Sequence, residues 1–320
     1  MNKKCKKWSK DRVIEELKRV SKKLGHSPTY REVGHKLRGA CVRYFETLNK
    51  AKKKAGLELW GLDNRPCTKL SKDITKEDFN LGYVVGVALG DGHIDAHSLS
   101  LEVKDKNFAD LFLQILEEWS GREPKIHSRY NKKYNSTYYR IRLFSVKIKK
   151  FLDEFTKDFD NILNSNLEFK RGFFKGVFDS EGCISPSNNV FFIANSDRNL
   201  INILRKIGES FGLRNPSVYA KTYGNGYKTV YNLTYIGKSN LLRLCDEIGV
   251  TIKRKIRPLE DEIKRWREEK RIYERVIELG REHSNKAGVA RLVSEEFNKR
   301  IPDRTVAHWI NQNRTPMVVK

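Results

Sequence analysis

The sequence has few cysteines and none of the spacings at which cysteines bind zinc. Five cysteines are scattered over 320 residues, and no two of them form a Cys-x-x-Cys pair. This excludes a disulfide framework and a zinc ribbon, and predicts reduced, mostly buried thiols. No apolar run is long enough to span a membrane, and the basic N-terminal segment lacks the hydrophobic stretch of a signal peptide. We therefore expect a soluble protein of the cytoplasm that does not contact a membrane.

Apolar residues are also scarce, whereas positive charge is abundant. Hydrophobic residues make up 38% of the chain, charged residues make up 32%, and the net charge is +24. This composition permits a folded core with a large hydrated surface. Such a surface can serve solubility alone. Basic residues interleaved with tyrosines on the expected strands and loops favour contact with the phosphate backbone of nucleic acid, at the nucleoid for example.

Two short segments, Val84–Gly92 and Phe174–Gly182, share one plan. Each is an apolar helical run with a central glycine, followed by a small residue, a carboxylate and a closing glycine. The likeness continues downstream: Pro124-Lys125-Ile126 of the first copy corresponds to Pro216-Ser217-Val218 of the second. A duplicated unit of roughly 90 residues is longer than the repeats of solenoid proteins. It predicts two similar halves packed about a pseudo-twofold axis.

The pattern of turns and apolar residues after each copy predicts an α+β fold. Each half is expected to be αββαββα with one antiparallel sheet, and small helical modules flank the two halves. Thr75-x-x-Asp78 and Ser165-x-x-Glu168 resemble capping boxes for the two motif helices. The expected organisation is a helical module (1–60), a linker (61–75), the two halves (76–160 and 161–255) and a helical module (256–320).

The carboxylates that end the two motif helices are Asp91 and Glu181. The C-terminus of a helix carries partial negative charge, and two carboxylates near each other repel further. Such an arrangement becomes favourable when a divalent cation lies between them, and hard oxygen ligands suit Mg²⁺. Small residues at Gly86 and Gly90, and at Gly176 and Ser180, would allow the two helix backbones to approach closely.

The paired segments resemble the two motifs of the LAGLIDADG homing endonucleases in their monomeric, two-motif form. The resemblance covers about Asp78 to Ile256. It implies a saddle of two four-stranded sheets over the major groove of double-stranded DNA, with the motif helices at the interface. It also implies that Asp91 and Glu181 bind the metals, that the carbonyls of Gly90 and Ser180 assist, and that the product is a staggered double-strand break.

Members of this family often carry a basic residue after the second strand of each half. Lys104 matches it in the first half, although a solvated lysine at a strand end is the alternative interpretation. Its counterpart in the second half, Ser196, cannot supply a charge, and Arg198 and Lys175 are the neighbours that could compensate. Unequal cleavage of the two strands, or nicking, therefore stays open.

Strand alternation identifies the residues expected to face DNA. Arg140 and Arg142 lie on one face, and the repeat places Asn232 and Thr234 on the matching face. Arginine suits guanine and asparagine suits adenine in the major groove. Other basic residues would contact phosphates, which position DNA without specifying sequence, and any one of them could equally be an ordinary surface charge. These residues are Lys125, Arg129, Lys132, Lys133, Lys221 and Lys228.

Both flanks suggest further contacts with DNA. Trp8 to Leu57 resembles the small helical repeat that accompanies homing endonucleases, where it is regarded as a DNA-binding accessory. The C-terminal segment resembles a helix-turn-helix, with Arg304, Thr305 and His308 as candidate contacts, and a plain helical cap on the core is the alternative.

The sequence thus predicts a Mg²⁺-dependent, site-specific DNA endonuclease that acts as a monomer. No pattern of a protein-splicing domain is present, so an intron-encoded or free-standing enzyme is expected. Two alternatives stay open: a transcription regulator that binds DNA on the same scaffold without cutting it, and a maturase that binds intron RNA. Both acids are present, which favours cleavage over the regulator.

Overall fold

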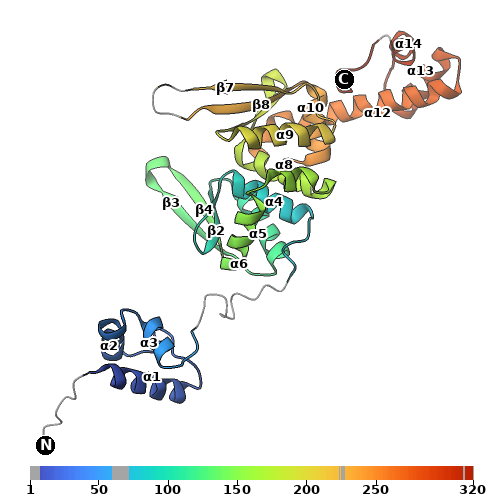
Figure 1. Cartoon of the computed structure of the whole chain (residues 1–320). Helices are drawn as coiled ribbons and strands as arrows, with labels where there is room; N and C mark the ends of the chain where they lie inside the picture. Colours follow the sequence, from blue (N-terminus) through green and yellow to red (C-terminus); the bar gives the residue numbers. More distant parts are fainter. Residues whose placement is uncertain (1–7, 60–71, 223, 225–227, 313, 320) are drawn as a thin grey trace, which may run out of the picture. The chain divides into compact units, whose positions relative to one another are not determined.

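The computed structural model describes residues 8–59, 72–222, 224, 228–312 and 314–319 (Figure 1). The chain divides into two compact units, residues 1–69 and 70–320, and each is described by itself. Most of the expected linker lies outside the described residues, as do Cys5 and Cys67. Within the described ranges, no helix combines the length and the apolar character needed to cross a membrane.

The N-terminal unit is a small helical bundle around Val13, Leu17 and Cys41. Ser9 caps the first helix. The second helix ends at Phe45, because a left-handed residue (Glu46, φ 64°) breaks the chain before the third helix begins. The helices are α1 (Lys10–Leu24), α2 (His35–Phe45) and α3 (Leu48–Lys54).

The second unit contains the two predicted αββαββα halves. Their antiparallel sheets have the same strand order, β1-β2-β4-β3 and β5-β6-β8-β7. Because order and direction repeat, the α+β prediction is confirmed. The first half comprises α4 (Phe79–Leu89), β1 (Gly92–Ile94), β2 (Ser98–Val103), α5 (Lys106–Ser120), β3 (Lys125–Asn131), β4 (Ser136–Phe144) and α6 (Val146–Phe155). After α7 (Phe159–Asn164), the second comprises α8 (Leu167–Glu181), β5 (Gly182–Ser185), β6 (Val190–Asn195), α9 (Arg198–Ser210), β7 (Ser217–Lys221), β8 (Val230–Ile236) and α10 (Lys238–Arg243).

Helices α4 and α8 cross with their backbones in contact, because glycines lie at the crossing. A Cβ on Gly82 would lie 2.1 Å from the carbonyl oxygen of Phe169, and a Cβ on Gly172 would lie 2.1 Å from that of Phe79. These reciprocal contacts relate the two halves by a pseudo-twofold axis. In Figure 1 the hairpins β3–β4 and β7–β8 extend from the same side of this helix pair.

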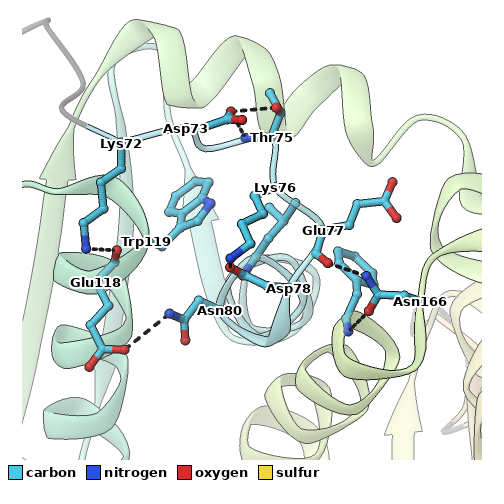
Figure 2. Close-up of polar contacts among 12 residues, drawn as sticks. Lys72, Asp73, Thr75, Lys76, Glu77, Asp78, Asn80, Glu118, Trp119 and Asn166 are labelled. Carbon is cyan, nitrogen blue, oxygen red and sulfur yellow. Dashed lines mark hydrogen bonds and ion pairs between the residues drawn. The ribbon is translucent and has the colours of Figure 1, made fainter.

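The two motif helices are capped three residues and one residue after the predicted caps, Thr75 and Ser165. Asp78 accepts a hydrogen bond from the Leu81 amide, and Asn166 accepts one from the Phe169 amide. Asn166 also donates to the carbonyl of Glu77, which joins the starts of the two helices (Figure 2). The predicted cap at Thr75 is wrong because its hydroxyl donates to Asp73. The predicted cap at Ser165 is likewise wrong, because its hydroxyl donates to the carbonyl of Asn161.

Each sheet buries one face against the helices. Ile141 and Leu143 of β4, and Leu233 and Tyr235 of β8, are at most 3% exposed. Since side chains alternate along a strand, the other residues of these strands form the opposite, open faces. Of the described cysteines, Cys41 is buried and Cys245 partly buried, but Cys183 is exposed, so the predicted burial is wrong for Cys183.

The described residues of the C-terminal segment form four α-helices and a second small core. The long helix α12 packs on the main core through Ile263 and Trp266, and its far end packs with the last two helices around Val276, Val289 and Val306. A 3-10 turn that contains a proline, Arg257–Leu259, separates α12 from the short helix before it. The helices are α11 (Lys253–Ile256), α12 (Glu260–Glu282), α13 (Lys286–Glu296) and α14 (Asp303–Ile310).

Candidate functional site

The two motif carboxylates lie at the ends of helices that touch. Gly90 caps α4, and a Cβ built on it would lie 2.5 Å from the Cβ of Ser180 and 3.5 Å from the Cγ of Glu181. Any side chain at position 90 would therefore force the two helix ends apart. The structure thus brings together all four residues predicted to bind metal: Asp91, Glu181, Gly90 and Ser180.

Both carboxyl groups resist ionisation. Burial raises the pKa of Glu181, and the charge of Asp91 raises it further. Asp91 is accessible to solvent at a pocket rim, yet enough protein surrounds it that burial raises its pKa as well. The charge of Lys255 lowers both pKa values without outweighing burial. Two such carboxylates gain from a divalent cation, which would offset their repulsion and supply the solvation that burial removes.

The chemistry of this donor set fits a hard cation. Two carboxylates and nearby backbone carbonyls are oxygen ligands of the kind that Mg²⁺ accepts, with water and phosphate completing the coordination. In the part of the chain that the structure describes, no cluster of three or more His, Cys, Asp or Glu side chains is arranged to hold a metal. A cation bound here would thus depend on Asp91, Glu181 and non-side-chain oxygens.

A cavity of about 570 Å³ opens beside the acids. Asp91, Ser180, Glu102, Lys104 and Lys255 line it. The predicted Lys104 is exposed just after β2, and its ammonium lies 5.5 Å and 5.3 Å from the ring centres of two tyrosines, Tyr134 and Tyr138. Cation–π contacts of this kind restrict the lysine while leaving its charge available to an anion. The cavity therefore combines acidic and basic groups.

Lys255 is a residue that sequence reasoning missed. Its Nζ donates to the carbonyls of Phe178 and Asp179, both at 3.0 Å, in the last turn of α8 just before Glu181. Burial lowers the pKa of this ammonium group, and Asp179 raises it. In the sequence, Lys255 is one of several cations in a charged segment. It reaches the site only because the chain folds back after the π-helical turn Leu244–Ile248.

A buried polar network holds that returning chain. Asp179, which is 1% exposed, accepts hydrogen bonds from the Thr251 hydroxyl (2.6 Å), the Thr251 amide (3.1 Å) and the Tyr83 hydroxyl (2.9 Å). Lys175 lies 3.6 Å from the same carboxylate, and burial lowers its pKa. The network ties α8 to the segment that carries Lys255. Lys175 is therefore engaged with Asp179.

Asn195 is a second residue that sequence reasoning did not identify. Its Nδ2 donates to Oε1 of Glu181 at 3.2 Å and lowers the pKa of that carboxyl group. Its place at the end of β6 orients the carboxylate. Arg198, the other candidate for a compensating charge, is exposed at the start of α9, with its guanidinium 5.9 Å from the ring centre of Tyr231.

The first sheet presents its predicted DNA-contacting residues on its open face. Arg140 lies 3.8 Å from a carboxylate oxygen of Glu102, and Arg142 lies 3.5 Å from one of Asp95. Arg129 donates to Glu102 at 2.9 Å. The predicted cations are thus ordered by acids that sequence reasoning missed. Lys125 lies opposite Arg142 in the sheet, and Lys132 and Lys133 are exposed in the turn between β3 and β4.

The second sheet differs from the first in how far its predicted DNA-contacting residues are buried. Asn232 and Thr234 lie on its open face as predicted, but they are only 7% and 9% exposed. Lys221 ends β7 and Lys228 follows the turn, and both are exposed. In the C-terminal segment, Arg304 is exposed on α14, whereas Thr305 and His308 are partly buried. These α14 residues belong to a separate core from the acids.

Comparison with known families gives two matches, on different parts of the chain. Residues 168–249, the second half, match the model of the LAGLIDADG-like domain. Residues 8–58 match the homing endonuclease associated repeat, which covers the whole N-terminal helical bundle. The segment that matches the LAGLIDADG-like model contains Glu181, Asn195 and the buried Asp179, and the first half of the unit repeats its order of helices and strands.

Comparison with individual proteins gives more distant matches. DNA-directed RNA polymerase subunit Rpo1C of Methanocaldococcus jannaschii is 24% identical over 133 residues, which cover 39% of this chain but only 15% of that subunit. A structure of the homing endonuclease I-DmoI in complex with DNA and manganese is 19% identical, covering 54% of this chain and 97% of that one, with a TM-score of 0.41. Full-length DUF199/WhiA from Thermatoga maritima is 13% identical, covering 76% and 92%, with a TM-score of 0.42.

Proposed function

We propose that the protein is a metal-dependent DNA endonuclease that makes a double-strand break at a specific site. The observation that carries the proposal is the meeting of Asp91 and Glu181 at two touching helix ends, with pKa values raised by burial. A purely structural role gives no reason to retain two carboxylates that resist ionisation. Both matched family models, of a LAGLIDADG-like domain and a homing endonuclease associated repeat, support this function.

Asp91 and Glu181, with the carbonyls of Gly90 and Ser180, would hold Mg²⁺ or another divalent cation. When bound, this cation would help to ionise the attacking water and would stabilise charge on the scissile phosphate. Asn195 orients the Glu181 carboxylate through its hydrogen bond. The chain itself therefore orients one of the two carboxylates before DNA arrives, and such preorganisation favours electrostatic catalysis.

Two lysines would bind the phosphate oxygens, one from each side of the cavity. Lys104 comes from the first half, and Lys255 follows the second. Lys255 would supply the charge that Ser196 cannot, so the two strands need not be cut unequally. Its ammonium donates to two carbonyl oxygens, which hold it in place, and burial lowers its pKa.

The same scaffold would present both sheets to double-stranded DNA as a monomer. The N-terminal repeat and helix α14 would add contacts with DNA, and linkage of such modules raises their effective concentration at the target. Arg304, Thr305 and His308 remain the proposed contacts of α14 as a helix-turn-helix. The positively charged surface favours association with nucleic acid in general.

The test is cleavage of a plasmid library in Mg²⁺ by the wild-type protein, Asp91→Asn and Glu181→Gln. We expect linear product from the wild type, none from the two variants, and DNA binding by all three. Asp261→Asn is the matched control, because Asp261 is an exposed acid on α12 whose loss should change nothing. Binding without cleavage by the wild type would overturn the endonuclease and favour a regulator. Preferential binding of structured RNA would favour a maturase.

A further inference from the structure

The open face of the first sheet is charged. In an antiparallel ladder, directly opposed residues project to the same face. Arg140 lies opposite Glu102 on β2 and His127 on β3, and Arg142 lies opposite Lys125. Arg129 joins them, since it pairs with Glu102. We call this set the charged face: Lys125, His127, Arg129, Arg140, Arg142 and Glu102.

The open face of the second sheet is neutral over most of its area. Asn232 lies opposite Ala194 and Tyr219, Thr234 lies opposite Phe192, and Ile236 continues the same side of β8. Tyr219 is 51% exposed and Ile236 is 63% exposed. We call this set the neutral face: Phe192, Ala194, Tyr219, Asn232, Thr234 and Ile236. Among the described residues, the cations Lys221 and Lys228 lie toward the far end of the β7–β8 hairpin.

The two faces suit different base pairs. Arginine forms bidentate hydrogen bonds with guanine, and glutamate accepts from the amino group of cytosine, so the charged face carries both partners of a G·C pair. On the neutral face, Asn232 and Thr234 are almost covered, and a base edge would meet Tyr219 and Ile236 first. Apolar side chains in the major groove contact the methyl group of thymine.

We propose that the two sheets read half-sites of different composition. The charged face reads a half-site with specified G·C pairs, and the neutral face reads a half-site rich in A·T pairs, with thymine methyl groups against Ile236 and Tyr219. The inference rests on the proposed function, because it requires DNA to lie across both sheets. It explains how a pseudo-symmetric scaffold would recognise an asymmetric target.

The ion pairs on the charged face strengthen this assignment. Glu102 holds Arg129 at 2.9 Å and lies 3.8 Å from Arg140. A carboxylate on a surface that only gripped phosphates would repel them, whereas next to a base-reading arginine it fixes the side chain before binding. The charge pattern therefore favours contact with base edges over contact with the backbone alone.

The test is sequencing of duplexes that the full-length protein selects from a randomised pool, in Ca²⁺ and separately in Mg²⁺. We expect a consensus with G·C pairs on one side and thymines on the other. Arg140→Gln should reduce the preference for guanine at one position of the target by about five- to hundredfold. The preferences in the other half-site should stay unchanged. Ile236→Asn should reduce the preference for thymine at one position, and only in the opposite half-site. Lys133→Gln, a change in the turn between β3 and β4, should lower the binding affinity for all DNA sequences alike.

The outcomes separate this inference from the proposed function. If the protein cuts DNA at a consensus whose two half-sites have the same base composition, the inference is overturned and the proposed endonuclease activity is retained. A consensus of unequal composition that is bound but never cut supports the inference and overturns the endonuclease. If Arg140→Gln lowers the binding affinity for every DNA sequence equally, the inference is also overturned, because that result indicates a contact with phosphate.

Discussion

Replacement of Gly82 by alanine tests how closely the two motif helices must approach. The new Cβ would lie 2.1 Å from the Phe169 carbonyl oxygen, whereas ordinary contacts lie at 3.4–4 Å. The helices would therefore have to separate by at least about 1 Å at this end, since the obstacle is backbone and cannot rotate away. Overpacking of this kind typically costs about 1–3 kcal/mol.

An alanine also favours helix over glycine by about 1 kcal/mol, which opposes the loss. We expect the balance to be a net destabilisation, because the separation also loosens the buried side chains along the whole crossing. For a unit of about 250 residues, each kcal/mol lowers Tm by roughly 2–4 °C. Gly172→Ala should cost about the same, since its Cβ meets the Phe79 carbonyl at the same 2.1 Å.

The assay is thermal unfolding followed by circular dichroism, together with cleavage per folded molecule. The double variant should lose less than the sum of the two single losses, because one separation accommodates both methyl groups. Gly288→Ala is the control: its nearest neighbour is the Asn285 side chain at 3.4 Å, so Tm should stay or rise. Wild-type Tm and wild-type cleavage in Gly82→Ala would refute the direct backbone contact.

Three further predictions concern the acids and the network behind them. In metal-free protein at neutral pH, Asp91→Asn should raise Tm. Because burial raises the folded-state pKa of Asp91, its ionised form disfavours the folded state above that pKa, and the gain should vanish below the pKa of the unfolded chain, near 4. Mg²⁺ should raise the Tm of the wild type more than that of Glu181→Gln, measured by the same melts. Thr251→Val should cost about 1.5–3 kcal/mol in denaturant unfolding, since Asp179 loses a donor, and cleavage should fall with the displacement of Lys255.

The duplicated segments predicted the helix crossing and the order of helices and strands in each half because these depend on local periodicity and on glycine spacing. The caps were predicted at Thr75 and Ser165, three residues and one residue before Asp78 and Asn166, which make the hydrogen bonds. Serine, threonine, asparagine and aspartate all cap helices, so their order in a polar segment does not decide which one acts. Only the path of the chain into the helix decides it.

Lys255 and Asn195 could not be predicted from motif spacing. Lys255 follows the second copy, and Asn195 lies at a repeat position where the first copy has Val103, so the pattern gives neither of them a role. Lys255 reaches the acids through a chain reversal whose anchor, Asp179, is itself buried. The same holds for Glu102 and Asp95, which order the arginines of the first sheet through sheet register and turn geometry. Alternation predicted the arginine face but contains no information on which acids lie across it.

Residues that differ between the two copies give the halves different chemistry. Where the second copy has Asp179, the first copy has Leu89, and where the second has Lys175, the first has Val85. The first half therefore cannot build the buried network. Asn195, which orients Glu181, corresponds to Val103. The Asn195 side chain thus holds Glu181 through a hydrogen bond. Asp91 lies at the rim of the cavity, and no described residue makes a corresponding hydrogen bond to it. The two carboxylates are therefore not interchangeable, even though the helices that carry them are related by symmetry.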